Sequence, residues 1–482
     1  MNATPPIFFH LARRPERCWF IALAFTSLVA AAHADRIDRY IEAQLKEQEI
    51  PGLALAVVRD GKVAKAKGYG LADVELNVPA TERSVFQWAS ITKQFTATAI
   101  MLLAQDGKLK LDDSISRHYT NAPSAWSNVT VRHLLTHTSG IKGYTELPNF
   151  FGTVRKDYEP DEIIGLVSDR ALDFAPGEKW AYSNTGYYLL GLVIEKASAQ
   201  SYGDFLAARI FRPLGMDTAC VNHQFEIIAN RATGYNLRSN RLWRSEFVSP
   251  TQPFSAGALV GTVLDLAKWD AALYTDKLLP APVLAEMWTP VKLNDGKVSP
   301  YGYGWQTGEV RGHPYVGHGG GIHGFTSFIL RLVQDKLTVI VLINTGANSQ
   351  GIATSVAGQF IQGLTLSSIK PQHDSEPKLS ARLKQCLVEM AEKKDSEILT
   401  PEFRENFSRS RRRHAALQKD MNGLRSFTFI IEEKPAADQR EVDNVPVKRV
   451  RNYKVTTADE TRYYTFALTA NDQVALVQAS HD

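Results

Sequence analysis

Apolar runs separated by turn residues mark the two ends of a long first region. Residues 50–70 hold two apolar runs around Asp60-Gly61, and residues 324–346 hold two more around a polar turn at 333–336. An Asp-Gly pair between apolar runs is a strong hairpin signal. Between the hairpins the pattern is mostly helical, with loops rich in Gly, Pro, Ser and Asn. We predict an α+β fold, in which an antiparallel sheet flanked by helices joins a mainly helical lobe across a cleft.

The pattern changes after residue 363. Residues 364–382 are polar and contain prolines, which predicts a linker. A helical stretch follows over 383–420, and then four candidate strands at 424–433, 447–456, 463–469 and 474–478. We therefore predict a first domain over 35–363, a linker over 364–382 and a small α+β accessory domain over 383–482.

The N-terminus has the three parts of a secretory signal peptide. Arginines precede an apolar run over 18–32, and Ala32-His33-Ala34 ends it. The run is shorter than the 18 or more residues expected of a spanning helix. We predict that residues 1–34 are a cleaved signal and that the mature protein is periplasmic or secreted, with no stable membrane span. An uncleaved membrane anchor is the alternative.

Composition excludes some classes of function. The chain has 482 residues, 22% of them charged, and a formal charge of only +4, which gives no concentrated basic face for nucleic acid. Of the three cysteines, Cys18 lies in the predicted signal. Cys220 and Cys386 are too few for a disulfide scaffold and lack the spacing of a metal site. The sequence leaves open whether these two pair.

One short segment carries candidate chemistry. In "WASITKQF", over 88–95, Ser90 is followed three positions later by Lys93. On a helix such positions share one face, with Cβ atoms about 5–6 Å apart. A serine hydroxyl needs a group that takes its proton, and a lysine can do so where burial lowers its pKa. The pair is common by itself, so its meaning depends on partners elsewhere in the chain.

Two further motifs supply candidate partners. Tyr182-Ser183-Asn184 lies in "WAYSNTGYYLLG", and His318-Gly319-Gly320-Gly321 stands directly before a predicted strand. In chain order, S-x-x-K, Y-x-N and H-G-G resemble the motifs of the serine β-lactamase and penicillin-binding protein superfamily. The closest resemblance is to the class C β-lactamase-like branch, which includes D-aminopeptidases, carboxypeptidases and esterases. The segments "HLLTHTSGI" and "YGYGW" also resemble that branch, and the resemblance covers about 35–363.

The resemblance implies a β-lactamase/transpeptidase-like fold and a role for each motif residue. Ser90 would be the nucleophile that is acylated. Lys93 and Tyr182 would share the proton transfers, and the sequence leaves open which of them is the main base. Asn184 would hydrogen-bond Lys93 and the substrate carbonyl.

The H-G-G motif carries further implications for substrate binding. By the resemblance, the backbone N–H of Gly321 would stabilise the oxyanion together with that of Ser90, and Gly319 and Gly320 would let substrate lie close to the strand. Many relatives have a lysine where His318 stands, and that cation meets a substrate carboxylate. Histidine is largely neutral near pH 7. We therefore expect peptide or small-amide hydrolysis first, ester hydrolysis as a side activity and penicillin hydrolysis last.

Other interpretations of the same residues stay open. A β-lactamase, a D-alanyl-D-alanine carboxypeptidase or a penicillin-binding sensor without turnover would share these motifs. A metal hydrolase is another possibility, because the sequence holds five histidines near the motifs, at 133, 137, 313, 318 and 323. However, no glutamate follows His133 as in H-E-x-x-H. An α/β-hydrolase would need a G-x-S-x-G elbow, which we do not find, and Ser139 is better placed in a turn.

The motifs also bound the partners that we expect. They call for a small-molecule or peptide substrate and for no metal or other cofactor, and they leave homo-oligomerisation open. Six aromatic residues near the motifs are candidates for the cleft wall: Trp180, Tyr187, Tyr188, Tyr301, Tyr303 and Trp305.

Overall fold

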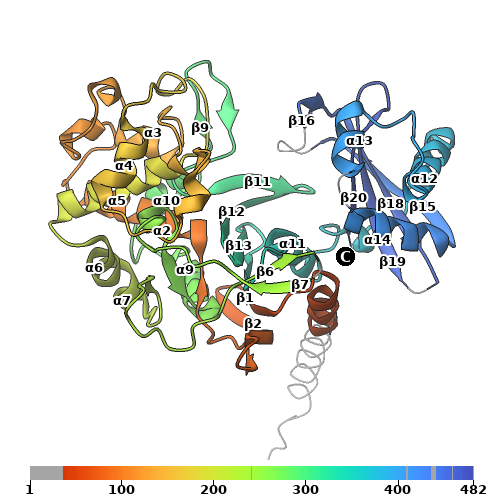
Figure 1. Cartoon of the computed structure of the whole chain (residues 1–482), viewed down its shortest axis with the longest axis horizontal. Helices are drawn as coiled ribbons and strands as arrows, with labels where there is room; N and C mark the ends of the chain where they lie inside the picture. Colours follow the sequence, from red (N-terminus) through yellow and green to blue (C-terminus); the bar gives the residue numbers. More distant parts are fainter. Residues whose placement is uncertain (1–35, 240, 409–410, 436–440, 459, 481–482) are drawn as a thin grey trace, which may run out of the picture.

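A computed structural model describes residues 36–482 except 240, 409–410, 436–440, 459 and 481–482. The predicted signal peptide, 1–34, lies outside the described residues. At the centre is a seven-stranded sheet with the order β11-β12-β13-β14-β1-β2-β3 (Figure 1). Its strands are β1 (Gly52–Arg59), β2 (Lys62–Asp73), β3 (Val78–Pro79), β11 (Gln306–Val310), β12 (His313–Ile322), β13 (Phe325–Leu332) and β14 (Leu337–Ile343).

The two predicted hairpins lie side by side in this sheet. Strand β1 pairs antiparallel with β14, from Leu53 opposite Ile343 to Arg59 opposite Leu337. Every neighbouring pair in the sheet is antiparallel, which confirms the predicted α+β fold and excludes the parallel sheet of an α/β-hydrolase. Nearly all residues of β1 and β14 are buried, because both faces of the sheet are covered, and this explains their continuous apolar runs.

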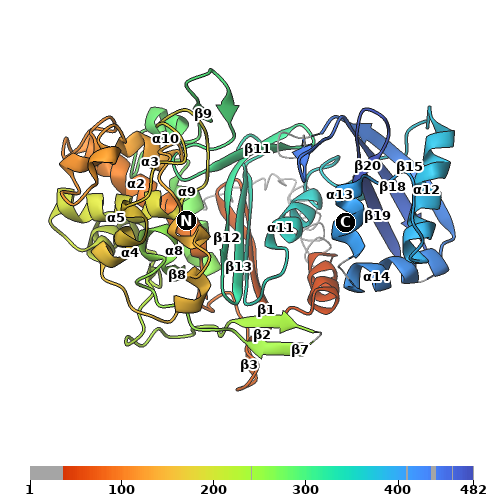
Figure 2. The ribbon, with the colours of Figure 1, turned by 45° about the horizontal axis from the view of Figure 1, so that its top comes forward.

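Two separate cores cover the two faces of the sheet. One face packs against α11 (Ser349–Gly358) and a helix over 36–47. The other face packs against the helical lobe (Figure 2). The lobe contains α2 (Thr92–Gln105), α3 (Val131–Leu135), α4 (Pro160–Ser168), α5 (Asn184–Ser198), α6 (Tyr202–Leu206), α7 (Arg212–Leu214), α8 (Phe254–Gly257), α9 (Val263–Ala272) and α10 (Ala281–Met287). Short strands outside the main sheet are β4 (Phe86–Gln87), β5 (Cys220–Val221), β6 (Tyr235–Arg238), β7 (Arg241–Arg244), β8 (Leu259–Gly261), β9 (Val291–Lys292) and β10 (Val298–Ser299).

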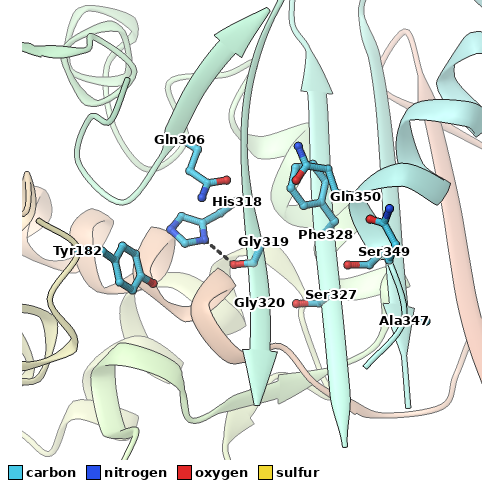
Figure 3. A pocket seen from close by; sticks show the side chains of 11 residues that line it. Tyr182, Gln306, His318, Gly319, Gly320, Ser327, Phe328, Ala347, Ser349 and Gln350 are labelled. Atoms are coloured by element: carbon cyan, nitrogen blue, oxygen red, sulfur yellow. Dashed lines mark hydrogen bonds between the residues drawn. The ribbon is translucent and has the colours of Figure 1, made fainter. Parts of the chain in front are cut away.

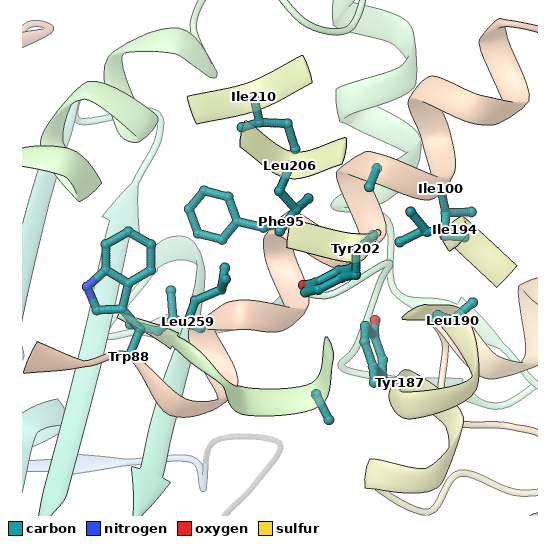
Figure 4. Packing of buried hydrophobic residues seen from close by; sticks show 14 of the residues in the cluster. Trp88, Phe95, Ile100, Tyr187, Leu190, Ile194, Tyr202, Leu206, Ile210 and Leu259 are labelled. Atoms are coloured by element: carbon teal, nitrogen blue, oxygen red, sulfur yellow. The ribbon is translucent and has the colours of Figure 1, made fainter. Parts of the chain in front are cut away.

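Helices α2 and α5 form the centre of the lobe, and their packing positions the candidate site. The ring of Phe95 on α2 lies 5.4 Å from that of Trp88, centroid to centroid (Figure 4). The ring of Trp269 lies 4.4 Å from Phe95. A Cβ at Gly191 would come within 2.1 Å of Ser255 Oγ, so only glycine lets α8 pack directly on α5. This close approach brings the start of α8 to the first turn of α2.

A second, smaller unit follows the main sheet. Its four-stranded sheet has the order β15-β18-β19-β20, and the four predicted strands are all present. The unit consists of β15 (Ser426–Glu433), β16 (Glu441–Val442), β17 (Val445–Pro446), β18 (Arg449–Thr456), β19 (Thr461–Leu468) and β20 (Val474–Ser480), with α12 (Pro377–Ala391), α13 (Pro401–Ser408) and α14 (Arg411–Asn422). The helical stretch was predicted to begin at 383, but α12 begins six residues earlier, at Pro377. Proline is favourable in the first turn of a helix, so it starts this helix and does not belong to a linker. The domain boundaries stay a prediction.

Two further observations concern membrane-spanning helices and a disulfide bond. Within the described ranges, no helix is both long enough and apolar enough to cross a bilayer. Cys220 and Cys386 are both free thiols.

Candidate active site

Ser90 and Lys93 meet at the junction of a short 3-10 turn and helix α2. Ser90 lies in the turn Ala89–Ile91, and Lys93 lies in the first turn of α2. The distance from Lys93 Nζ to Ser90 Oγ is 3.1 Å. Ser90 is partly exposed, whereas Lys93 is fully buried. The structure therefore places the predicted pair in hydrogen-bond contact, with the hydroxyl on the open side.

The other partners of Lys93 are two carbonyl oxygens. Its Nζ lies 2.9 Å from Asn184 Oδ1 and 2.6 Å from the backbone oxygen of Ala256. Both oxygens only accept hydrogen bonds, so each takes one N–H of the amine. In the neutral amine the remaining position is a lone pair, and it faces Ser90 Oγ. Burial lowers the pKa of Lys93 well below its ordinary value. The geometry is that of a base ready to accept the Ser90 proton.

The backbone around Ser90 is strained and tightly packed. Ala89 has φ of +49°, a left-handed conformation that is uncommon for a residue with a side chain. A Cβ at Gly320 would lie 2.2 Å from the backbone oxygen of Trp88, so β12 touches this turn directly and position 320 needs glycine. Ser327 on β13 donates a 2.7 Å hydrogen bond to the same oxygen. Strand and turn together hold Ser90 in place.

Gly321 differs from Gly320 in its surroundings. A Cβ at Gly321 would meet nothing within 4 Å. The fold therefore does not require glycine at this position. A side chain there would project into open space beside β12.

Tyr182 completes the group through a hydrogen bond with Ser90. Burial raises the pKa of its phenol well above the usual value, and a hydrogen bond with Ser90 offsets part of this rise. Lys93 Nζ lies 4.8 Å from the centroid of the Tyr182 ring. A phenol with a raised pKa stays protonated at neutral pH, so Tyr182 holds a proton here and is not a phenolate base.

Asn184 is held from two directions. It is the first residue of α5, whose N-cap is Ser183, with Ser183 Oγ accepting a hydrogen bond from Gly186 N–H. The Asn184 amide nitrogen donates to Thr145 Oγ1 at 3.1 Å. This bond orients the amide so that its oxygen faces Lys93.

The hydrogen bonds of His318 define its tautomer. Its Nδ1 lies 2.6 Å from the backbone oxygen of Gly319, which can only accept, so Nδ1 carries the proton (Figure 3). Its Nε2 then accepts from the hydroxyl of Tyr301 at 2.8 Å. Burial, and the nearby Lys93, lower the pKa of His318 to about 3. The imidazole is therefore neutral at physiological pH and offers no cation to a substrate.

A cavity of about 390 Å³ adjoins this group. Ser90 and Lys93 are not among the residues that line it. None of the described residues that line it carries a charge. They are Tyr182, Gln306, His318, Gly319, Gly320, Ser327, Phe328, Ala347, Asn348, Ser349 and Gln350.

The H-G-G motif is followed by the predicted strand, β13, and it also lies within a strand that was not predicted. Residues 318–321 belong to β12 and pair with β13, from His318 opposite Ile329 to Gly321 opposite Thr326. Glycine has low strand propensity, so the sequence pattern did not indicate strand β12. Five of the six aromatic candidates are buried core residues, and only Trp180 is exposed; the five are Tyr187, Tyr188, Tyr301, Tyr303 and Trp305.

The remaining histidines have other partners. His133 Nδ1 accepts from Thr130 N–H at 3.2 Å and completes the capping box of α3. His313 Nδ1 lies 3.0 Å from Asp335 Oδ2. In the part of the chain that the structure describes, no three His, Cys, Asp or Glu side chains are grouped to hold a metal ion.

Three contacts of the site had no sequence signal that we could use. The Ala256 carbonyl comes from a run of small residues, Thr145 from a loop, and the Tyr301 hydroxyl from a residue predicted only as a cleft aromatic. Each depends on which segment packs beside the motif.

We expect the buried neutral His318 to make stability depend on pH. In the unfolded chain this histidine takes up a proton below its ordinary pKa of 6.5, whereas the folded form resists protonation down to about 3. The free energy of unfolding should therefore fall as pH drops through this window, by up to about 1.4 kcal/mol per unit from this group. Urea unfolding at pH 7, 6 and 5 measures it. His318→Gln, which keeps a donor and an acceptor, should show a shallower slope; equal slopes would contradict the assignment.

Fold and site together define a class of protein. A serine beside a buried lysine at the start of a helix, next to an antiparallel sheet flanked by helices, is the arrangement of the serine β-lactamase and penicillin-binding protein superfamily. The chain belongs to the beta-lactamase family, whose model matches residues 37–356.

Individual relatives agree with this membership. Penicillin-binding protein 4* of Bacillus subtilis is 32% identical over 321 residues, covering 62% of this chain and 69% of its own length. The D-amino acid amidase of Ochrobactrum anthropi, solved with L-phenylalanine amide, is 28% identical with a TM-score of 0.58, covering 67% of this chain and 96% of its own. An octameric penicillin-binding protein homologue from Pyrococcus abyssi shares the fold over 91% of this chain and 97% of its own, with a TM-score of 0.61 and 24% identity.

Proposed function

We propose that the protein hydrolyses amide bonds of peptides or small amides through an acyl-enzyme on Ser90. The observation that carries the proposal is the environment of Lys93. Two carbonyl oxygens occupy its N–H groups, and its third position faces Ser90 Oγ at 3.1 Å. A buried amine without a counter-charge is costly, and here it supplies the base that a serine nucleophile needs.

The proposed acylation step uses each group once. Ser90 Oγ attacks the substrate carbonyl carbon while its proton passes to Lys93 Nζ. Backbone N–H groups of Ser90 and Gly321 stabilise the oxyanion. As the C–N bond breaks, Tyr182 gives its proton to the leaving nitrogen and takes one back from Lys93. This division makes Lys93 the base and Tyr182 the acid of the first half-reaction.

Deacylation repeats the sequence with water. Water attacks the acyl carbon and loses a proton to the same pair of side chains. The ester bond to Ser90 breaks, Ser90 Oγ recovers its proton, and the acid is released. The products are a carboxylic acid and an amine, and the enzyme returns to its starting protonation state.

The neutral cavity supports a substrate preference. A dominant carboxylate contact would need a cation, and a charged hydrogen bond is usually worth about 1.5–3 kcal/mol. His318 is neutral, and the lining residues carry no charge. The solved amidase relative, with an amino acid amide bound, is consistent with amide substrates. We therefore rank amides first, short-chain esters second and penicillins last.

The proposed location rests on the N-terminal sequence alone. Its basic segment, apolar run and Ala32-His33-Ala34 support export to the periplasm or the medium. Wall peptides, scavenged peptides and foreign esters or lactams are the substrates available there.

A substrate panel tests the proposal. We expect D- or L-amino acid p-nitroanilides to give higher kcat/KM values than nitrocefin or D-Ala-D-Ala peptides, with p-nitrophenyl esters also cleaved. The Ser90→Ala protein supplies the background rate. If nitrocefin or a D-Ala-D-Ala peptide exceeds the others by a hundredfold, about 2.7 kcal/mol in transition-state binding, the β-lactamase or carboxypeptidase alternative replaces ours. Labelling of Ser90 without turnover of any substrate would favour a penicillin-binding sensor.

A further inference from the structure

His137 lies beside the site, with its ring against that of Tyr182. It follows α3, is 1% exposed, and has φ of +59°. This left-handed conformation is uncommon for a residue other than glycine, and such strain persists only where the surroundings enforce it. The imidazole is packed against Tyr182, Tyr187 and Tyr301, with centroids 4.3, 5.0 and 4.6 Å away.

His137 accepts two hydrogen bonds, one from the residue before Tyr182 and one from the residue after it. The backbone oxygen of His137 accepts from Ala181 N–H at 3.0 Å. The imidazole Nδ1 accepts from Ser183 N–H at 3.1 Å. One residue therefore accepts hydrogen bonds from the N–H groups of both neighbours of Tyr182, and its ring packs on the phenol ring.

The same contacts exclude other roles for this imidazole. A backbone N–H can only donate, so Nδ1 carries the lone pair and Nε2 the proton. The lone pair is already used by Ser183. Nε2 is buried and has no hydrogen-bond partner among the described residues. As it stands, His137 can neither accept a substrate proton nor bind a metal ion.

We infer that His137 is a positioning residue, which holds the Tyr182 hydroxyl where it can protonate the leaving group. This inference rests on the proposed role of Tyr182 as the acid of acylation. A proton donor must lie within hydrogen-bond reach of the atom it protonates. A displacement of about 1 Å can cost roughly 10²-fold in rate. Loosening the 181–183 segment would allow such a displacement while Ser90 and Lys93 stay in place.

The chemistry of the leaving group gives a specific readout. A p-nitrophenolate leaves without protonation, whereas an anilide or alkoxide needs a proton as its bond breaks. Loss of positioning should therefore harm the p-nitroanilide and the ethyl ester of D-phenylalanine much more than its p-nitrophenyl ester. Because kcat/KM reports only the steps through acylation, the shared acyl group makes the three substrates directly comparable.

Two variants separate the acceptor from the backbone strain. Glycine and asparagine both tolerate the left-handed φ, but only asparagine has an oxygen near the position of Nδ1. We expect His137→Gly to lower kcat/KM about 100-fold for the anilide and ethyl ester and less than about 10-fold for the p-nitrophenyl ester. His137→Asn should recover most of this loss. Thermal unfolding of both variants checks that the fold is retained.

A double mutant identifies the partner. If His137 acts through Tyr182, His137→Gly should cost little more in a Tyr182→Phe background, so the two effects are not additive. Equal losses on all three substrates, additive effects or failure of asparagine to restore activity would overturn the inference alone. Full activity of Tyr182→Phe would overturn both the inference and the proposed role of Tyr182. An anilide that is not cleaved while the ethyl ester is would count against the amide preference only, because the ethyl ester still tests His137.

Discussion

Ser90→Ala is expected to abolish turnover, with a loss of about 10⁶-fold in kcat, as for nucleophile loss in other serine hydrolases. The reason is that no other described hydroxyl shares the contact with Lys93 Nζ seen at Ser90 Oγ. The variant should stay folded, because the hydroxyl lies on the open side of the turn. Intact-mass analysis with a slow substrate, followed by peptide mapping, should place the acyl adduct on Ser90 in the parent protein.

Other serines of the chain serve as controls for the assignment of Ser90. Ser168 is the last residue of α4 and is partly exposed, so Ser168→Ala should keep parental activity. Ser139 and Ser183 lie near the site but are buried, and the Ser183 hydroxyl caps α5. An adduct on either of these two serines would refute the assignment of Ser90.

Lys93→Arg is expected to lose about 10²- to 10⁴-fold in kcat/KM, the usual contribution of a general base. A guanidinium cannot give up its proton at working pH, so conserving the charge does not conserve the function. It would also be a buried cation without an ion-pair partner, and the variant should be less stable. Lys93→Met, which is neutral, should be equally inactive. In the parent, kcat/KM should rise with pH as Lys93 loses its proton.

Stability distinguishes the two variants. The folded pKa of Lys93 lies below its unfolded value of 10.5, so the unfolded chain binds more protons between these values and stability rises with pH there. Lys93→Met removes this dependence and should be more stable than the parent at pH 7. Urea unfolding at pH 7 and 9 measures the difference. Parental activity in Lys93→Arg would show that the lysine acts only through its charge.

Much of the fold was predictable because it depends on local patterns. Asp60-Gly61 between two apolar runs specifies a hairpin, and the continuous apolar runs of β1 and β14 identify strands that are covered on both faces. The pairing of the two hairpins followed from the need to bury both. The strand at 318–321 was missed, because three glycines in a row carry no apolar pattern.

In the candidate site, too, some features follow from the sequence and others only from the tertiary structure. The Ser90–Lys93 contact spans three residues and follows from helical geometry, so the sequence by itself determined it. The protonation states did not follow from any motif. They depend on a carbonyl 163 residues from Lys93, on a hydroxyl 17 residues from His318, and on an imidazole 46 residues from Ser183. A pKa or a tautomer is set by desolvation and by the atoms within hydrogen-bond distance, and only the tertiary structure decides which atoms those are.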